Sequence, residues 1–333
     1  MKAFVIDQYG RKERGRVADV PEPVVRDDDV LVEVHAASVN VLDAKIRSGE
    51  FKLILPYRFP LILGNDVAGT VLRVGPGVRR FKPGDEVYAR PDEGRIGGFA
   101  ELISIKEASL AHKPAKLTME EAASIPLVGL TAWQVLVDVA QVQPGQKVLI
   151  HAGSGGVGTI AIQLAKQLGA FVATTTGTSN VEWVKRLGAD VVIDYRTQDF
   201  AATLRDYDVV LNGLGTDVLE KSLQVLRPGG QLISISGPPT PQFASEQGLG
   251  WPLKQVFRLL SYRIRKQAAR RGVRYAFVFM RANGEQLGKI SSLIDSGQIR
   301  PVVDRSYPLA SAADALAYVE QGRAKGKVIV NIR

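Results

Sequence analysis

The sequence contains no cysteine and only three histidines among its 333 residues. The missing thiols exclude disulfides, thiolate zinc sites and a cysteine nucleophile. The histidines, His35, His112 and His151, are too scattered along the chain to indicate a metal cage. We interpret them as structural or surface residues, and the sequence therefore predicts no bound metal.

Long apolar runs are also missing. No apolar segment reaches the roughly 20 residues needed to cross a bilayer. The first residues, MKAFVIDQYGRKERG, indicate a strand followed by a charged turn, without the apolar core of a signal peptide. The length of 333 residues allows two domains with a core each. We therefore expect a cytoplasmic protein of two domains.

Acidic residues are absent from one long window, between Glu246 and Glu285. The window carries the whole net charge of +9, because the other 34 of the 43 basic residues balance 34 acidic ones. Within it, WPLKQVFRLLSYRIRKQAARRGVRY has apolar residues at helical spacing with cations around them. Three roles remain open: a solvated helix over the active-site cleft or a subunit contact, a weak contact of residues 251–275 with an anionic membrane, or nucleic-acid binding. The sequence favours the last least, since no recognition fold is visible.

Two patterns divide the chain near Thr118. Before it, short strands such as DVLVEVHAASVN alternate with Gly-Pro-Gly and Pro-Gly-Asp turns, which is typical of an antiparallel, barrel-like region. After it, Thr118 and Glu121 form a capping-box pair that opens a helix predicted over residues 118–140. Strand and helix patterns then alternate, which predicts an α/β fold with a doubly wound parallel sheet. We place the domains at 1–122 and 123–270, with a return at 271–333 that completes both and ends in the strand GKVIVNI.

The most informative segment is KVLIHAGSGGVGTIAIQLAKQLGA. Gly153, Gly155 and Gly158 fit the pattern G-x-G-x-x-G, directly after an apolar strand and before an amphipathic helix. These glycines allow a tight turn, a close approach to a pyrophosphate and close packing of helix on strand. The helix N-terminus also favours phosphate. The segment Gly153–Gly158, with Ser154, Gly156 and Val157, is therefore predicted to bind a dinucleotide.

The end of the next strand indicates which dinucleotide. NAD-binding folds usually have Asp or Glu there, about 20 residues after the glycines. Here the residues are FVATTTGTSN, and the first acid is Glu182. Thr176 and Thr178 leave room for a 2′-phosphate, and Lys185, Arg186 and Tyr195 lie within reach of it in sequence. The sequence therefore predicts NADP(H).

A polar pair, Asn65 and Asp66, interrupts the apolar run LILGNDVAGTVLRVG. Buried polar groups cost free energy unless they find partners. The pair therefore either satisfies other groups of the protein or faces a ligand, and the run alone leaves both interpretations open.

With the cofactor loop beside it, the segment GNDVAGTVLRVGPGVRRFKPGDEV resembles the glycine-rich signature of the medium-chain dehydrogenase/reductase superfamily. The resemblance covers essentially the whole chain in the same order. SVN-x-x-D, zinc-free GND, PLVGLTAWQVL and AGSGGVGTIAIQLAK are similar to the quinone oxidoreductase branch and its enone- and alkenal-reducing relatives. The resemblance implies a GroES-like first domain, a Rossmann-type nucleotide domain, and hydride transfer from NADPH to quinones or α,β-unsaturated carbonyl compounds. It also implies a homodimer.

The resemblance implies a metal-free site as well. In zinc-dependent members the position of Asn65 is a metal-binding His, and that of Asn40 is a metal-binding Cys. A conjugated acceptor spreads incoming charge onto its own oxygen, so hydrogen-bond donors can take the place of a Lewis acid. We predict Asn40 and Asn65 as pocket residues and Tyr57 as a candidate proton donor, while Asp43 is expected to hold its loop through Lys45 or Arg47.

Further cofactor contacts follow from the same resemblance. It places Lys45 near the cofactor, Thr131 near the nicotinamide-side phosphate and Tyr195 at the adenosine end. The predicted contacts of the nicotinamide half are Asn212, Gly213, Ser236, Phe279 and Arg281. One departure is Asn180, where plant-type enone reductases have Lys.

The favoured function is thus a zinc-independent, NADPH-dependent reductase. The alternative is an NADPH-binding protein without enzymatic activity, a redox sensor or a binder associated with nucleic acid or membranes, built on the same fold. Oxidation of NADPH by simple quinones and enones distinguishes the two.

Overall fold

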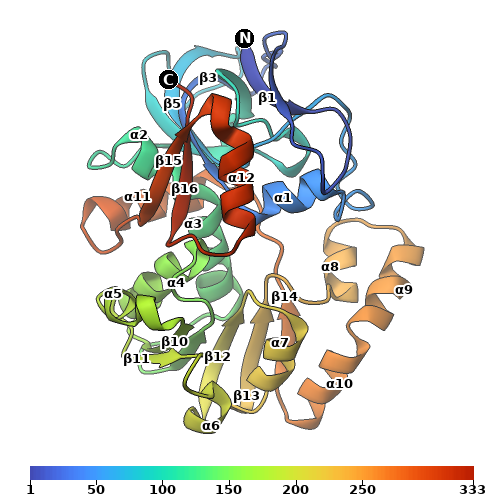
Figure 1. The fold of residues 1–333 in the computed structure, drawn as a ribbon, viewed down its shortest axis with the longest axis vertical. Helices are drawn as coiled ribbons and strands as arrows, with labels where there is room; N and C mark the ends of the chain where they lie inside the picture. Colours follow the sequence, from blue (N-terminus) through green and yellow to red (C-terminus); the bar gives the residue numbers. More distant parts are fainter. The chain divides into compact units, whose positions relative to one another are not determined.

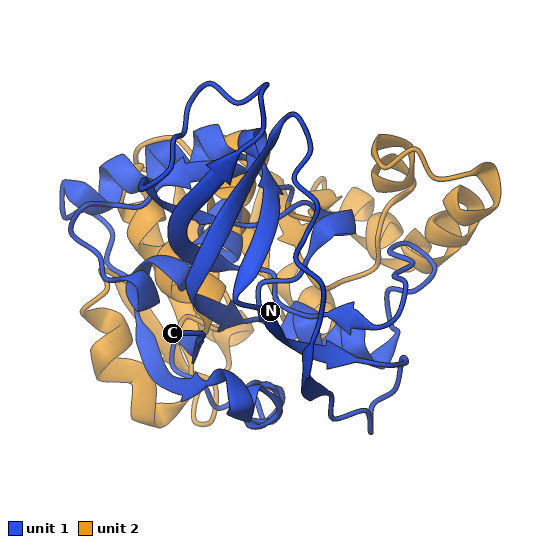
Figure 2. Ribbon diagram, turned by 90° about the horizontal axis from the view of Figure 1, so that it is seen from above, with its two compact units in different colours: residues 1–130, 281–333 blue, residues 131–280 orange.

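The computed structural model describes all residues from Met1 to Arg333. It divides into two compact units (Figure 2): unit 1 comprises residues 1–130 and 281–333, and unit 2 comprises residues 131–280. None of the helices combines the length and the hydropathy needed to span a membrane.

Unit 1 is built mainly on antiparallel strands, as the turn-rich first third of the sequence predicts, and only β15 and β16 pair in parallel. A seven-stranded sheet has the order β15-β16-β3-β5-β6-β8, with β7 paired to β3, and a three-stranded sheet has the order β2-β1-β4. The strands are β1 (Lys2–Ile6), β2 (Arg16–Asp19), β3 (Asp29–Val39), β4 (Leu61–Ile62), β5 (Val67–Val74), β6 (Glu86–Ala89), β7 (Leu102–Lys106), β8 (Leu110–His112), β15 (Val303–Pro308) and β16 (Lys327–Asn331).

The C-terminal strand β16 returns to unit 1 and pairs antiparallel with β3, which confirms the return predicted from GKVIVNI. Figure 1 shows the red strands β15 and β16 beside the blue and cyan strands of the N-terminal region. The helices of this unit are α1 (Val41–Ser48), α2 (Met119–Ala123), α11 (Gly284–Asp295) and α12 (Ala312–Glu320), and α3 (Pro126–Trp133) continues into unit 2.

Unit 2 is a six-stranded sheet in which every neighbouring pair is parallel, in the order β11-β10-β9-β12-β13-β14. The first strand, β9, lies in the middle, and the chain winds outward on one side and then on the other. This is the doubly wound arrangement that the alternating pattern predicts. The strands are β9 (Lys147–Ile150), β10 (Phe171–Thr176), β11 (Val191–Asp194), β12 (Tyr207–Asn212), β13 (Leu226–Ser234) and β14 (Arg274–Phe277).

Short helices connect these strands (Figure 1). They are α4 (Gly156–Gln167), α5 (Val181–Lys185), α6 (Phe200–Thr203), α7 (Thr216–Ser222), α8 (Pro241–Glu246), α9 (Trp251–Leu260) and α10 (Tyr262–Arg270). The last of these contributes Ile264 and Ala268 to the apolar core of the unit.

The prediction of one continuous helix over residues 118–140 is wrong, because the segment forms separate helices. The capping box of Thr118 and Glu121 is present and opens α2, but α2 ends at Ala123 and Pro126 begins a new helix. Proline at a first helical position is favourable, whereas inside a helix it removes a hydrogen bond and clashes with the preceding turn. The segment Gln134–Val139 then continues as a π-helix.

Candidate functional site

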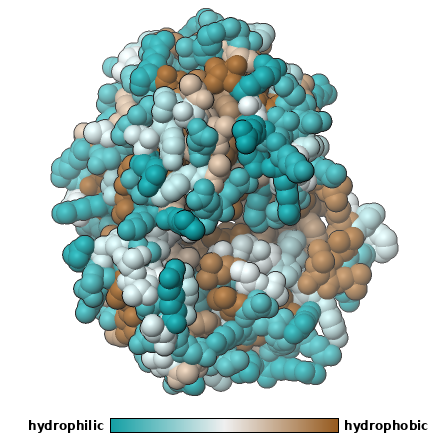
Figure 3. All heavy atoms as spheres, in the orientation of Figure 1, coloured by the Kyte–Doolittle hydropathy of each residue, from teal (hydrophilic) through white to brown (hydrophobic).

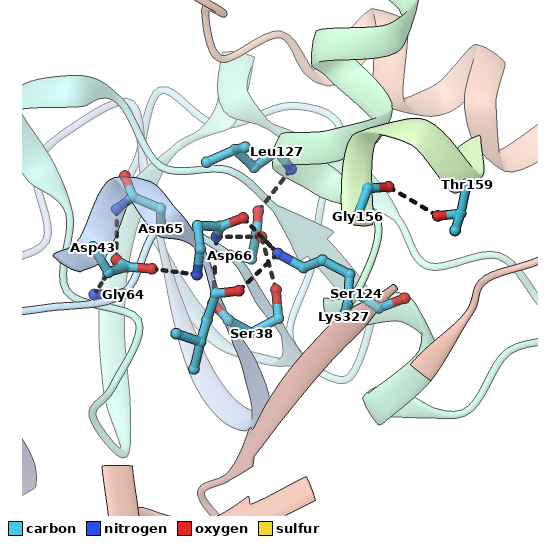
Figure 4. A network of polar contacts seen from close by, with 12 residues as sticks. Ser38, Asp43, Gly64, Asn65, Asp66, Ser124, Leu127, Gly156, Thr159 and Lys327 are labelled. Atoms are coloured by element: carbon cyan, nitrogen blue, oxygen red, sulfur yellow. Dashed lines mark hydrogen bonds and ion pairs between the residues drawn. The ribbon is translucent and has the colours of Figure 1, made fainter. Parts of the chain in front are cut away.

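The carboxylate of Asp66 lies at the centre of a buried polar cluster in unit 1 (Figure 4). Its Oδ2 accepts hydrogen bonds from Ser38 Oγ at 2.8 Å and Asn40 Nδ2 at 2.8 Å, and Lys327 Nζ lies 3.2 Å away. Its Oδ1 accepts from the backbone N–H of Leu127 at 2.7 Å. Four donors occupy the lone pairs of this carboxylate, so Asp66 holds the cluster together.

Lys327, at the start of β16, supplies the positive charge of this cluster. Its ammonium is buried and donates to Val39 O at 3.1 Å, to Asn40 Oδ1 and to Asp66 Oδ2. Three donors thus meet three acceptors, which is what a buried ammonium needs. Sequence reasoning missed Lys327. The signal for it was indirect: an acid in an apolar run requires a cation, but nothing in the sequence says which one.

A second buried pair joins Asn65 to Asp43 (Figure 4). Asn65 is fully buried, and its Nδ2 donates to Asp43 Oδ1 at 2.7 Å. Asp43 also accepts from the backbone N–H groups of Asn40 at 2.7 Å and Gly64 at 3.2 Å. An ionised carboxylate only accepts, so this contact fixes the amide orientation and turns Asn65 Oδ1 away from Asp43. That oxygen is buried without a hydrogen-bond partner.

Burial raises the pKa of Asp43 to about 6, and the hydrogen bonds from Asn40 N and the Asn65 amide oppose this shift. The expectation that Asp43 holds its loop through Lys45 or Arg47 is wrong. Lys45 pairs with Glu50 at 2.9 Å and Arg47 with Glu320 at 2.7 Å. The short side chain of Asp43 instead meets the N–H groups of its own helix start and of Gly64.

The three candidate catalytic residues differ in which of their polar atoms remain without a hydrogen-bond partner in the protein. Asn40 donates to Asp66 and to Ser38 O and accepts from Lys327, so its amide is engaged on both sides. Asn65 keeps one acceptor, Oδ1. The hydroxyl of Tyr57 donates to Glu93 O, and burial raises its pKa, which makes it a weaker acid. Among these side chains, the polar atom without a partner is the acceptor Asn65 Oδ1. The catalytic roles of the three residues stay predictions.

In unit 2 the glycine loop joins β9 to α4 as the sequence predicts. A Cβ on Gly153 would lie 2.2 Å from Thr174 Oγ1, and one on Gly158 would lie 2.3 Å from Ala152 O. Both positions therefore require glycine for close packing. Gly155 is the N-cap of α4, and the hydroxyl of Thr159 binds Gly156 O at 2.9 Å inside the first turn (Figure 4). Residues 154–157 stay partly exposed.

Most other residues predicted to contact the cofactor lie at the carboxyl ends of the parallel strands. Asn212 ends β12, and its side chain bonds Leu214 N at 3.2 Å and Leu214 O at 3.1 Å, which shapes the turn that contains Gly213. Ser236 follows β13 and donates to Leu214 O at 2.9 Å. Phe279 follows β14, with its ring centroid 5.9 Å from that of Phe243. Ligands of doubly wound sheets bind at this edge, beside the point where the strand order reverses.

The ends of β10 and β11 meet at Gly177. A Cβ on Gly177 would lie 3.3 Å from the Tyr195 hydroxyl and 3.7 Å from Arg196 Nε. Thr176 Oγ1 is buried without a partner, and a hydrogen bond from Thr178 lowers the pKa of Asp194. Tyr195 is 59% exposed. The Arg196 guanidinium is a cation at this edge that sequence reasoning missed, although DYR directly after a strand of a parallel sheet was a usable signal.

The remaining predicted cofactor residues lie elsewhere. Lys185 ends α5 and is exposed. Thr131 is buried in α3. Lys45, in α1, is paired with Glu50, and Arg281 opens the C-terminal part of unit 1. Cofactor contact stays a prediction for these four residues, as it does for the other predicted cofactor residues.

His151, directly after β9, is buried between two hydroxyls. Its Nδ1 lies 3.0 Å from Thr175 Oγ1 and its Nε2 lies 2.9 Å from Ser222 Oγ, while its ring packs edge-on against Phe200. Burial lowers the pKa of His151 to about 3. The imidazole is therefore neutral at pH 7 and supports the start of the glycine loop.

We expect His151 to make stability depend on pH. The unfolded state takes up a proton below about pH 6.5 and the folded state only near pH 3, so His151 contributes stability that is lost as the pH falls through this window. The raised pKa of Asp43 acts in the opposite direction between about pH 4 and 6. Asp43 is present in both wild type and His151→Asn, so its effect cancels in their comparison. Between about pH 3 and 6.5, the free energy of unfolding of wild type should therefore fall relative to that of His151→Asn by about 1 kcal/mol for each pH unit of acidification. Urea unfolding of both proteins at several pH values measures this, and parallel profiles would contradict it.

No group of three or more His, Cys, Asp or Glu side chains in the structure is arranged to hold a metal ion. The chain matches two family models, "Alcohol dehydrogenase GroES-like domain" over residues 26–115 and "Zinc-binding dehydrogenase" over residues 187–330. The first match confirms the GroES-like domain expected at the N-terminus.

Relatives match the chain over its full length. It is 34% identical to "NAD(P)H oxidoreductase RTN4IP1, mitochondrial" of Danio rerio, over all of this chain and 91% of that protein. It is also 34% identical to "NADPH-dependent alkenal/one oxidoreductase, chloroplastic" of Arabidopsis thaliana, over 99% of this chain and 79% of that protein. The structure of the quinone oxidoreductase from Coxiella burnetii superposes with a TM-score of 0.87 at 32% identity, covering 100% of this chain and 99% of that one. The chain therefore belongs to the medium-chain dehydrogenase/reductase superfamily, among its quinone and alkenal oxidoreductases, and is an enzyme of that oxidoreductase type.

Proposed function

We propose that the protein transfers a hydride from NADPH to quinones or to α,β-unsaturated carbonyl compounds. The observation that carries the proposal is the carboxyl edge of the sheet in unit 2. There the glycine loop opens α4, and the end of β10 carries hydroxyls and Gly177 in place of an acid. The names of the Arabidopsis and Coxiella relatives support the same chemistry.

The residues at this edge fit a dinucleotide with a 2′-phosphate. The partly exposed backbone of residues 154–157, at a helix N-terminus, suits the pyrophosphate. Gly177 leaves space beside the Tyr195 hydroxyl and the Arg196 guanidinium, and Thr176 Oγ1 lacks a partner. A phosphate accepts hydrogen bonds from such donors, whereas a ribose 2′-OH alone would usually meet a carboxylate. Asn212, Gly213, Ser236 and Phe279 are the candidates for the nicotinamide half.

The chemistry of the acceptor determines what the protein must supply. NADPH, when bound, supplies the hydride. In an enone the hydride adds to the β-carbon, and the electron pair of the double bond moves onto the carbonyl oxygen. A proton from water then completes the saturated product. A quinone takes up the same hydride and proton to give the hydroquinone. Because conjugation carries the charge to oxygen, the reaction needs orientation and hydrogen bonds more than a Lewis acid.

The test is NADPH oxidation by the purified protein with simple quinones and simple enones. We expect steady turnover with at least one of the two acceptor classes, and slower turnover with NADH at equal concentration. Binding of NADPH without oxidation by any acceptor would favour the non-enzymatic alternative. Oxygen consumption with semiquinone formation would show one-electron reduction and overturn the hydride step.

We expect Asn65→Ala to lower kcat/KM for an enone about tenfold while leaving NADPH affinity largely unchanged. Asn65 Oδ1 is buried without a partner and can only accept a hydrogen bond, whereas a simple enone has no N–H or O–H to donate. The fitting donor is therefore the water molecule that delivers the proton to the product. Steady-state kinetics and NADPH titration by fluorescence measure the two effects.

Asn331→Ala is the matched control, because Asn331 also donates its amide to an acid, Glu120, at 2.6 Å in the same unit. Turnover of Asn65→Ala equal to that of Asn331→Ala would assign Asn65 to packing around Asp43. The homodimer and the cytoplasmic location stay predictions, and light scattering of the purified protein tests the first.

A further inference from the structure

Unit 2 exposes a cluster of large apolar side chains on α9 and at the start of α10. Of the fourteen large hydrophobic residues exposed in the whole structure, five fall between residues 251 and 262. They are Trp251 at 72% exposure, Val256 at 46%, Leu259 at 77%, Leu260 at 57% and Tyr262 at 55%. Single exposed apolar residues are ordinary, but a contiguous set indicates a binding surface. Figure 3 shows brown, hydrophobic spheres gathered over the region of α8 and α9.

The packing of α9 explains why this face stays outward. Phe257 is buried and its ring centroid lies 6.0 Å from that of Phe243, so one side of the helix is anchored in unit 2. Val256, Leu259 and Leu260 are three and four residues apart and share another side. They are therefore not needed for the core, and the helix presents them to solvent.

Cations surround this apolar face, and most of them have no acid to balance them. Residues 247–284 contain no Asp or Glu. Arg263 pairs with Glu220 at 2.9 Å, and Lys266 lies over the Tyr262 ring at 5.4 Å. Lys254, Arg258, Arg270 and Arg271 are exposed and form no ion pair. The surface thus combines bulky apolar side chains with uncompensated positive charge.

We propose that α9 and α10 form a peripheral docking surface for an anionic lipid bilayer. Leu259, Leu260 and Val256 would enter the boundary between headgroups and acyl chains, and Trp251 and Tyr262 would lie at headgroup level. Lys254, Arg258 and their neighbours would contact the lipid phosphates, which attract cations close to the membrane surface. A second copy of the chain fits less well, since a symmetric contact would face this positive surface with itself. Nucleic acid would use the cations but leave the aliphatic side chains exposed to water.

The test is co-sedimentation of the full-length protein with vesicles of phosphatidylcholine alone or with about 30 mol% phosphatidylglycerol, at about 0.05 M and about 0.5 M salt. We expect binding to the anionic vesicles at low salt, reduced at least fivefold at high salt, and little binding to phosphatidylcholine. In the double variant Leu259→Ser/Leu260→Ser the lipid concentration for half-binding should rise at least tenfold. A blue shift of Trp251 fluorescence on binding, absent in Trp251→Phe, reports insertion.

The matched control is the double variant Leu72→Ser/Phe171→Ser, whose two side chains are exposed apolar residues outside α9 and α10. Thermal unfolding verifies that both double variants fold. Absence of binding to anionic vesicles overturns the proposal, and so does binding that Leu259→Ser/Leu260→Ser leaves unchanged. A wild-type dimer that this variant dissociates, without vesicle binding, would instead identify the face as a contact between copies of the chain.

Discussion

Replacing Lys327 with methionine should lower the free energy of unfolding by about 3–5 kcal/mol. The substitution keeps most of the side-chain volume but leaves Asp66 as a buried carboxylate without its cation, and it also removes donors from Val39 O and Asn40 Oδ1. An uncompensated buried charge costs far more than a lost surface pair. Denaturant unfolding of wild type and variant measures the difference.

Two controls separate the buried pair from a general effect of lysine. Lys2 forms an ion pair with Asp19 at 2.7 Å, and both side chains are largely exposed, so Lys2→Met should cost less than about 1 kcal/mol. The double variant Asp66→Asn/Lys327→Met removes both charges and should recover at least half of the loss. If Lys327→Met and Lys2→Met lower the free energy of unfolding equally, the ion pair between Asp66 and Lys327 does not stabilise the unit.

The other large effect is expected at Arg196. Arg196→Glu should weaken NADPH binding about 100-fold, equal to about 2.7 kcal/mol, because it replaces a cation next to Gly177 with a carboxylate that repels a 2′-phosphate. NADH binding should change less than threefold, since NADH lacks that phosphate. Fluorescence titration with both cofactors provides the two dissociation constants.

Arg323→Glu, an equal change of charge at an exposed position of unit 1, is the control for long-range electrostatics. It should leave both affinities nearly unchanged. A parallel loss of NADPH and NADH affinity in Arg196→Glu would mean that the residue supports the loop and does not discriminate between the cofactors.

The sequence predicted best those features that local patterns determine. The strand, glycine loop and helix at residues 147–167 form as expected, because the glycine positions are set by contacts between near neighbours such as Ala152 and Gly158. The capping box at Thr118 is equally local. The alternation of strands and helices also predicted the doubly wound parallel sheet, since crossover connections leave few other arrangements.

Features that depend on distant residues could not be predicted in the same way. Lys327 and Asp66 are 261 positions apart in the chain, and nothing in the sequence distinguishes Lys327 from the other lysines as the partner of Asp66. The orientation of the Asn65 amide depends on Asp43, whose own partners turned out to be backbone N–H groups. The place of Arg196 directly after a strand was visible in the sequence, but its proximity to Gly177 depends on the pairing of β10 with β11, which sets Thr176 opposite Asp194.

The position of Lys327 has a consequence for the order in which the chain can fold during synthesis. Unit 2 is continuous, from Thr131 to Met280, and is complete while the last strand is still inside the ribosome. Unit 1 needs residues from both sides of unit 2, and its Asp66 lacks a cation until residue 327 emerges. We therefore expect nascent chains stopped before residue 327 to contain a protease-resistant unit 2 and a protease-sensitive N-terminal segment.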